Sequence, residues 1–290
     1  MTTNDGTVID VTKILDHGPD TDRWNLVILS EGYQSAELTN FHLHAVEFTT
    51  TLLKAAPFDS LADAINVHRV DVASTDSGAD SPATCGGVTT GPGTTARTYF
   101  DATYCGDGQT RRLLTINQTT AQSVATTQVP NTQAIVVIVN STEFGGSGGR
   151  AAVFSLDPAA LEIGLHELGH GAFNLADEYC LAGTAFNNHP TTEPLEPNVT
   201  VGTTPATIKW GFLIDPATQV PTTSNGDCTT CDPNPSPVPV GTLGAFEGAH
   251  FFHCGVFRGE FDCRMRTLGT DFCLNCNRQI SLVLNPFLPP

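Results

Sequence analysis

Residues 161–179 read LEIGLHELGHGAFNLADEY, and this stretch decides how the rest of the chain is interpreted. Its first half is apolar and suited to a helix, which the pattern predicts over residues 158–173. The helix carries an HExxH motif made of His166, Glu167 and His170. Residues four apart on a helix stand about 40° apart around its axis, so both imidazoles can reach one metal ion.

The motif predicts a catalytic zinc site. Two histidines, a third protein ligand and an open position for water make the usual catalytic arrangement. Zinc lowers the pKa of water toward neutrality, and Glu167 is placed to take the proton as general base and to pass it to the leaving amine. We therefore expect a zinc metalloendopeptidase with Zn as its cofactor and a protein or peptide as its substrate.

The third metal ligand is expected just after the helix. In metzincin-type zinc enzymes the helix ends at a glycine turn, and a His or Asp three residues later binds the metal. Here Asn174, the next best residue for a left-handed helix end, takes the turn, and Asp177 follows three residues later. Glu178 is the alternative ligand, or else a hydrogen-bond partner of the site. Glu193 and Glu196 are later candidates, but prolines flank them and disfavour a helix.

Strand-like and helix-like segments alternate before residue 175. Alternation of this kind predicts the α/β class. We expect an N-terminal arm over residues 1–22 and a single catalytic domain over residues 23–290, with a Pro- and Thr-rich insertion at 183–240. The predicted strands cover 24–29, 65–72, 134–139 and 151–155, and the predicted helices cover 35–55 and part of 112–128.

A glycine cluster at residues 145–149 (GGSGG) precedes the strand predicted at 151–155. Glycines beside a strand suggest the close approach of another backbone. The alternative is a flexible loop.

The chain resembles the immunoglobulin-A peptidase family of zinc metallopeptidases, a metzincin-like group, in five blocks: LVILSEGYQ, FDSLADAINVHRVDVASTDSGAD, the glycine cluster, HELGHGAFNLADEY and FRGEFDCRMRTLGTDFCLNCNRQI. The resemblance implies a metzincin-like zinc protease with a twisted mixed sheet, an active-site helix and an irregular cysteine-rich C-terminal part. It implies that Met265 forms the methionine turn beneath the zinc. It also implies that Gly146, Gly148 and Gly149 lie at the rim of the cleft, where an extended substrate adds as a strand.

Nine cysteines make disulfides or a metal site expected, and they favour a secreted or cell-surface protein, although the N-terminal residues show no signal peptide. We expect at least two disulfides, one of them Cys85–Cys105, and an odd cysteine left over as a free thiol or in an intermolecular bond. An alternative is a four-thiolate zinc site built from two CxxC pairs, Cys228 with Cys231 and Cys273 with Cys276. A second metal at His250 and His253 is a further alternative, and ordinary buried histidines are the simpler interpretation.

Charge and hydropathy exclude two kinds of partner. The chain has 13 basic and 30 acidic residues and a formal net charge of −17, with no basic stripe, which argues against nucleic acid. No apolar run reaches the ~18 residues that a membrane span needs.

Two other functions stay open: a zinc hydrolase of another amide, such as a peptidoglycan crosslink, and a surface-binding protein with a decayed site. Intact Glu167 argues against decay, because binding alone needs no base.

Overall fold

The computed structural model of the protein describes residues 5–231 and 235–290. Its backbone divides into two compact units. Unit 1 comprises Met1–Ala172 with Leu284–Pro290, and unit 2 comprises Phe173–Val283. Residues 1–4 of the predicted arm and residues 232–234 of the predicted insertion lie outside the described residues.

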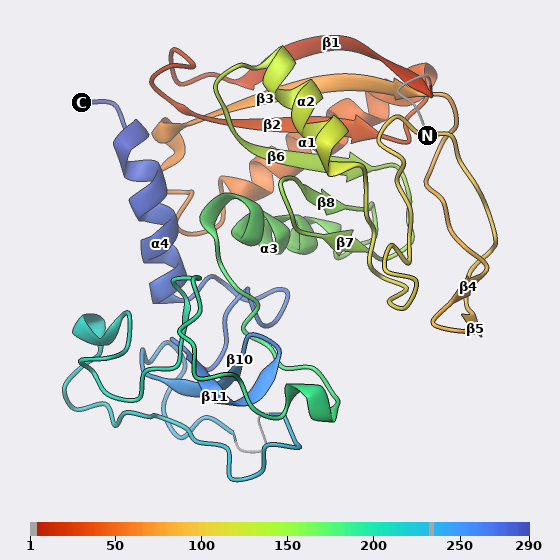
Figure 1. Ribbon diagram of the computed structural model, residues 1–290. Helices are drawn as coiled ribbons and strands as arrows, with labels where there is room; N and C mark the ends of the chain where they lie inside the picture. Colours follow the sequence, from red (N-terminus) through yellow and green to blue (C-terminus); the bar gives the residue numbers. More distant parts are fainter. Residues whose placement is uncertain (1–4, 232–234) are drawn as a thin grey trace. The chain divides into compact units, whose positions relative to one another are not determined.

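A six-stranded mixed sheet forms the centre of unit 1 (Figure 1). Its strand order is β1-β3-β2-β6-β8-β7. The four inner strands run parallel, while β1 and β7 at the edges run antiparallel to their neighbours. The strands are β1 Gly6–Leu15, β2 Trp24–Glu31, β3 Ile65–Ser74, β6 Thr132–Val139, β7 Gly146–Ser147 and β8 Ala152–Phe154. The α/β class and the mixed sheet are confirmed, and the likeness to metzincins stays a prediction.

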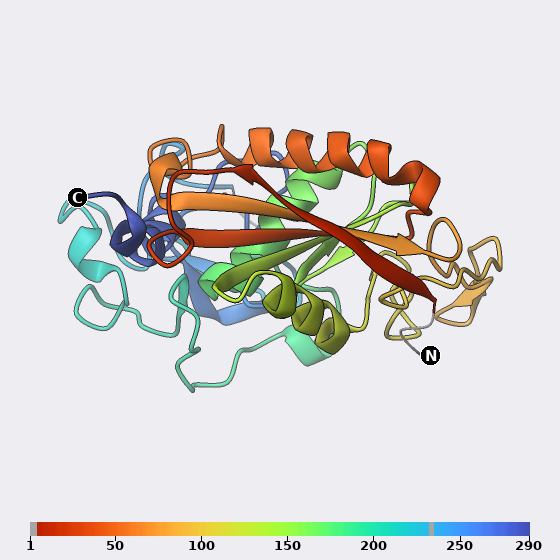
Figure 2. The ribbon, with the colours of Figure 1, turned by 90° about the horizontal axis from the view of Figure 1, so that it is seen from above.

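Helices cover both faces of this sheet (Figure 2). On one face α2 (Gln118–Gln128) shares a buried apolar cluster with Val27 and Leu29 of β2. On the other face lies α1 (Leu38–Leu52), where the ring centroid of Phe48 is 5.1 Å from that of Phe154 in β8. Because both faces are covered, β2 is buried along its whole length, and its residues 26–29 form an apolar run.

Local signals account for the helix boundaries. The helix predicted from Ser35 begins as a 3₁₀ turn, η1 (Ser35–Glu37), where Gln34 and Glu37 form a capping box, and becomes α-helical at Leu38. The helix with the HExxH motif is α3 (Ala160–Phe173), close to its predicted range. Unit 1 also contains η2 (Ala62–Ala64) and η5 (Asn285–Phe287).

The predicted disulfide Cys85–Cys105 is confirmed in unit 1. Cys85 ends β4 (Thr84–Cys85), which pairs antiparallel with β5 (Val88–Thr89). The bond ties this small hairpin to the turn at Cys105, inside a segment predicted to be mostly loop.

Unit 2 has little regular structure. A three-stranded sheet, in the order β10-β11-β9, is followed by one α-helix. These elements are β9 Val199–Thr200, β10 Phe246–Ala249, β11 Phe252–Arg258 and α4 Leu274–Leu284, with the 3₁₀ turns η3 Thr184–Phe186 and η4 Gly211–Leu213. Two more disulfides, Cys180–Cys231 and Cys228–Cys254, cross-link it.

In the irregular part of unit 2, single side chains hydrogen-bond to main-chain carbonyls. The indole N–H of buried Trp210 donates to the Gly244 carbonyl at 2.7 Å. The Lys209 ammonium donates to the main-chain carbonyls of Pro194, Glu196 and Val199 at 2.6–2.8 Å. Such bonds satisfy main-chain groups that no sheet or helix pairs. Within the described residues, no helix is both long and apolar enough to span a bilayer.

Candidate active site

The two motif histidines meet on one face of α3. The Nε2 atoms of His166 and His170 lie 3.2 Å apart, and their ring centroids are 4.9 Å apart. Two nitrogen ligands of a tetrahedral zinc ion, each at about 2.0–2.1 Å from the metal, lie about 3.3 Å from each other. The pair therefore has the spacing that a shared zinc ion needs.

Close packing of the glycine cluster against α3 shapes the surroundings of Glu167. A Cβ atom on Gly148 would lie 3.0 Å from Oε2 of Glu167 and 3.2 Å from Cβ of His170. From the helix side, a Cβ atom on Gly171 would lie 2.9 Å from the Gly149 carbonyl oxygen. The predicted close approach of another backbone to the glycine cluster is thus confirmed, and that backbone is α3. Gly171 was not singled out from the sequence.

Gly146 lies between two chain segments. It pairs with Phe154 of β8 on one side. On the other side its N–H donates to the Arg112 carbonyl at 3.1 Å, and its own carbonyl accepts the Leu114 N–H at 3.4 Å. The main chain of Gly146 is therefore already engaged, and a substrate role for Gly146, Gly148 and Gly149 stays a prediction.

Asn174 ends α3 as expected. Its φ angle is 54°, in the left-handed region, immediately after the last helical residue. Asp177 follows in unit 2, where its carbonyl accepts the His250 N–H at 2.9 Å. The Asp177 side chain as third ligand stays a prediction.

Glu178 is fully buried in unit 2 and has defined partners. Its Oε1 atom accepts a hydrogen bond from Nδ2 of Asn198 at 2.9 Å and one from the Cys276 thiol at 3.3 Å. Burial raises the pKa of Glu178 well above its usual range.

Met265, expected to form the methionine turn, is fully buried within a turn. Its carbonyl accepts the N–H of Glu178 at 2.7 Å. This bond joins the turn to the chain that follows α3, and the position of Met265 beneath a metal stays a prediction.

The alternative four-thiolate site is wrong. Cys228 and Cys231 are both in disulfides, so they cannot act as thiolate ligands beside Cys273 and Cys276. Instead of one odd thiol, three cysteines of the described chain form no disulfide: Cys263, Cys273 and Cys276.

The two histidines considered for a second metal have other neighbours. His253 directs its two ring nitrogens to the carbonyls of Cys228 and Leu181, at 2.8 and 2.7 Å. His250 lies with its Nδ1 atom 3.1 Å from Nε2 of His189. The contacts of His253 favour the simpler interpretation of a buried, hydrogen-bonded histidine, and a metal at His250 stays a prediction.

Sequence reasoning missed a buried group formed by Glu178, Cys263, Cys273 and Cys276. The available signal was a third cysteine, Cys263, shortly before the CxxC pair. Nothing local linked Glu178 to it, because the two residues lie 85 positions apart in the chain.

Comparison with known proteins identifies the class. The model of a family described as IgA Peptidase M64 matches residues 12–231, which is most of the 290-residue chain. The protein is therefore a peptidase. It belongs to the IgA peptidase M64 family, as its sequence blocks predicted. The block at residues 257–280 lies outside the matched range. Among curated proteins, no match to the chain is found.

Proposed function

We propose that the protein is a zinc-dependent endopeptidase whose metal ligands are His166, His170 and Asp177. The observation that carries this proposal is the 3.2 Å separation of the two Nε2 atoms, which suits a shared zinc ion. Membership of a peptidase family supports the reaction class. Of the two carboxylates after the helix, we favour Asp177, because Glu178 is already bonded to Asn198 and Cys276.

Zinc bound there would supply Lewis acidity, which makes water a nucleophile near neutral pH. Glu167 follows the first ligand directly, so it is the group that accepts the proton of the attacking water and returns it to the leaving amine. The glycine cluster leaves Glu167 and His170 the space that any larger side chain at Gly148 would fill.

We further propose that an extended peptide binds beyond Gly146, toward Gly148 and Gly149. The main chain of Gly146 is already paired at the edge of the sheet, so main-chain hydrogen bonds to a substrate strand have to form beyond this residue.

A secreted or cell-surface location is also proposed. The three disulfides support it, because such bonds persist in oxidising compartments.

The test is hydrolysis of casein and of a peptide library by the purified full chain, with zinc content measured on the same sample. We expect cleavage that a chelator abolishes and added zinc restores. Equal cleavage with and without chelator would contradict the zinc mechanism. Inactivity on all peptides together with release of crosslinks from peptidoglycan would replace the proposed substrate class. Zinc binding without any hydrolysis would favour the surface-binding alternative.

A further inference from the structure

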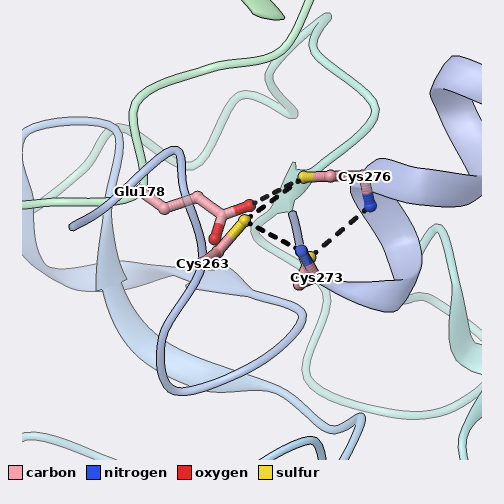
Figure 3. A group of neighbouring side chains, drawn as sticks. All are labelled: Glu178, Cys263, Cys273 and Cys276. Carbon is pink, nitrogen blue, oxygen red and sulfur yellow. Dashed lines mark hydrogen bonds between the residues drawn. The ribbon is translucent and has the colours of Figure 1, made fainter. Parts of the chain in front are cut away.

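A second group of metal-ligating side chains lies entirely within unit 2. Glu178, Cys263, Cys273 and Cys276 come from three places: the chain after α3, the turn that holds Met265, and the start of α4. Figure 3 shows the Glu178 carboxylate directed at the sulfur atoms. One ligand atom from each residue lies within 4.8 Å of all the others, and none of the four residues is more than 4% exposed.

Two ligand-to-ligand distances in this group match those of a tetrahedron around one zinc ion. Two sulfur ligands at about 2.3 Å from zinc lie about 3.8 Å apart, and a sulfur and an oxygen ligand lie about 3.5 Å apart. The Sγ atoms of Cys263 and Cys276 are 3.7 Å apart. The Sγ atom of Cys276 is 3.3 Å from Oε1 of Glu178.

Main-chain groups around the sulfur atoms favour thiolates. The Cys273 N–H donates to Sγ of Cys263 at 3.2 Å, and the Cys276 N–H donates to Sγ of Cys273 at 3.5 Å. Cys273 and Cys276 also stand at the N-terminal end of α4, where the helix dipole stabilises negative charge. The buried guanidinium of Arg258 interacts favourably with the Glu178 carboxylate and offsets part of the charge of four anionic ligands.

The second oxygen of Glu178 provides an independent observation. Oε2 is buried and accepts no hydrogen bond from the described part of the chain. A buried carboxylate oxygen without a partner is costly, and nearly all such atoms in native proteins are paired with protein, water or an ion. Asn198 holds the carboxylate in place, since its Nδ2 donates both to Glu178 and to the Ala176 carbonyl, at 2.9 Å each.

We propose that Glu178, Cys263, Cys273 and Cys276 bind a second zinc ion, which is structural. Three thiolates and one carboxylate, gathered within 4.8 Å of one another, suit zinc better than calcium or magnesium, which prefer oxygen ligands. All four positions are filled by the protein, which leaves no open position for a substrate. The ion joins three segments of unit 2 that no disulfide connects.

The first test counts metals and identifies their ligands on the full chain. We expect two zinc ions per wild-type chain and one in a His166→Ala, His170→Ala double variant. Cobalt loaded into that double variant should give an intense sulfur-to-metal charge-transfer band, which Cys263→Ser should abolish. The HExxH site has no sulfur ligand, so this readout is independent of the proposed peptidase mechanism.

A disulfide is the competing outcome. Non-reducing peptide mapping of protein purified without reductant should find Cys263, Cys273 and Cys276 unpaired. A disulfide between any two of them, or a double variant that binds neither zinc nor cobalt, would overturn the proposal.

Two further measurements keep the proposal testable if Cys263→Ser does not fold. In the wild-type protein, an alkylating reagent should label none of the three thiols until a chelator is added. Labelling before chelation would contradict the site.

Glu178→Gln should weaken zinc binding at this site by about tenfold or more, judged by competition with a chromogenic chelator. Glu260→Gln is the matched control, because Glu260 is a buried carboxylate that accepts the Leu274 N–H outside the group.

Discussion

At the scale of single residues, two neighbouring carboxylates are assigned to two different metal ions. Asp177 is proposed for the histidine site and Glu178 for the cysteine site, and one peptide bond separates them. Their side chains are similar, so only their surroundings distinguish their roles. For Glu178 those surroundings are Asn198 and Cys276.

The pair gives a prediction about metal content. Asp177→Ala should lose the zinc of the HExxH site and retain the cobalt–thiolate band, whereas Glu178→Gln should weaken the thiolate site and retain zinc at His166 and His170. Metal analysis and cobalt spectra of the two purified variants measure this. If Asp177→Ala keeps both ions at full affinity, Asp177 is not the third ligand.

A second prediction concerns the general base. Glu167→Gln removes the proton acceptor and keeps the shape of the side chain, so hydrolysis should fall by at least ~100-fold with the zinc content unchanged. Glu162→Gln, one and a half turns earlier on α3, is the control and should remain within a few-fold of wild type. Turnover near the wild-type level in Glu167→Gln would remove this residue from the mechanism.

The residues that could be predicted share a local pattern. The spacing of His166 and His170 and the helix end at Asn174 depend on one stretch of chain, and the structure confirms both geometries. The group around Cys263 could not be derived in this way, because it depends on which distant segments meet. The structure shows the same limit at Cys228 and Cys231, whose disulfide partners, Cys254 and Cys180, lie far along the chain.

At the scale of elements, α3 packs through a glycine. A Cβ atom on Gly164 would lie 2.6 Å from the Phe154 ring and 2.8 Å from the Phe48 ring. Gly164→Ala should therefore lower the free energy of unfolding by about 1–2 kcal/mol, since overpacking outweighs the gain in helix propensity. Denaturant unfolding measures this. Gly226→Ala, where no atom lies within 4 Å, should change stability little. An equally stable Gly164→Ala would show that α3 can shift away from the sheet.

The end of β2 gives a prediction about pH. Glu31 is buried and accepts hydrogen bonds from the N–H groups of Phe100 and Ala102 at 3.0 Å. Burial raises the pKa of Glu31 to about 7. The nearby charge of Asp101 also raises this pKa, whereas the hydrogen bonds from the two N–H groups lower it. Between pH 4.5 and 7 the folded protein therefore holds a proton that the unfolded chain releases.

The sign follows from that difference. The contribution of Glu31 to stability is largest at low pH and is lost as the pH rises to about 7, by roughly 3 kcal/mol at most. Glu31→Gln cannot titrate, so the stability of wild type minus that of the variant should fall over this range. Urea unfolding of both proteins from pH 4 to 8 tests it. A constant difference would mean that folding does not raise the pKa of Glu31.

Helices and strands whose apolar residues follow a clear local pattern could be predicted from the sequence, whereas short or glycine-interrupted elements could not. The apolar runs of β2 and β6 and the helix α3 were recognised close to their bounds. The strands β10 and β11 and the helix α4 were not recognised. β10 and β11 are short and interrupted by glycine, and α4 follows two cysteines within a segment that looked irregular.

At the scale of the whole molecule, the two units are stabilised by different means. Unit 1 buries a sheet between helices, while unit 2 relies on two disulfides, small apolar clusters and the proposed zinc. In a mixture of reductant and chelator, unit 2 should open first. Limited proteolysis should then cut within residues 183–240 while the strands β2, β3 and β6 stay intact. Reductant alone and chelator alone are the controls and should each cause slower cleavage. Earlier cutting in the sheet of unit 1 would contradict this division.

The three unpaired cysteines also bear on how the chain matures. Nine cysteines allow on the order of 10³ ways to form four disulfides, whereas six allow about 15 ways to form three. If zinc occupies Cys263, Cys273 and Cys276 before an oxidant reaches the chain, the search is reduced to the smaller number. The metal then serves as a protecting group during oxidative folding. Protein produced under zinc starvation would accordingly accumulate as mispaired isomers.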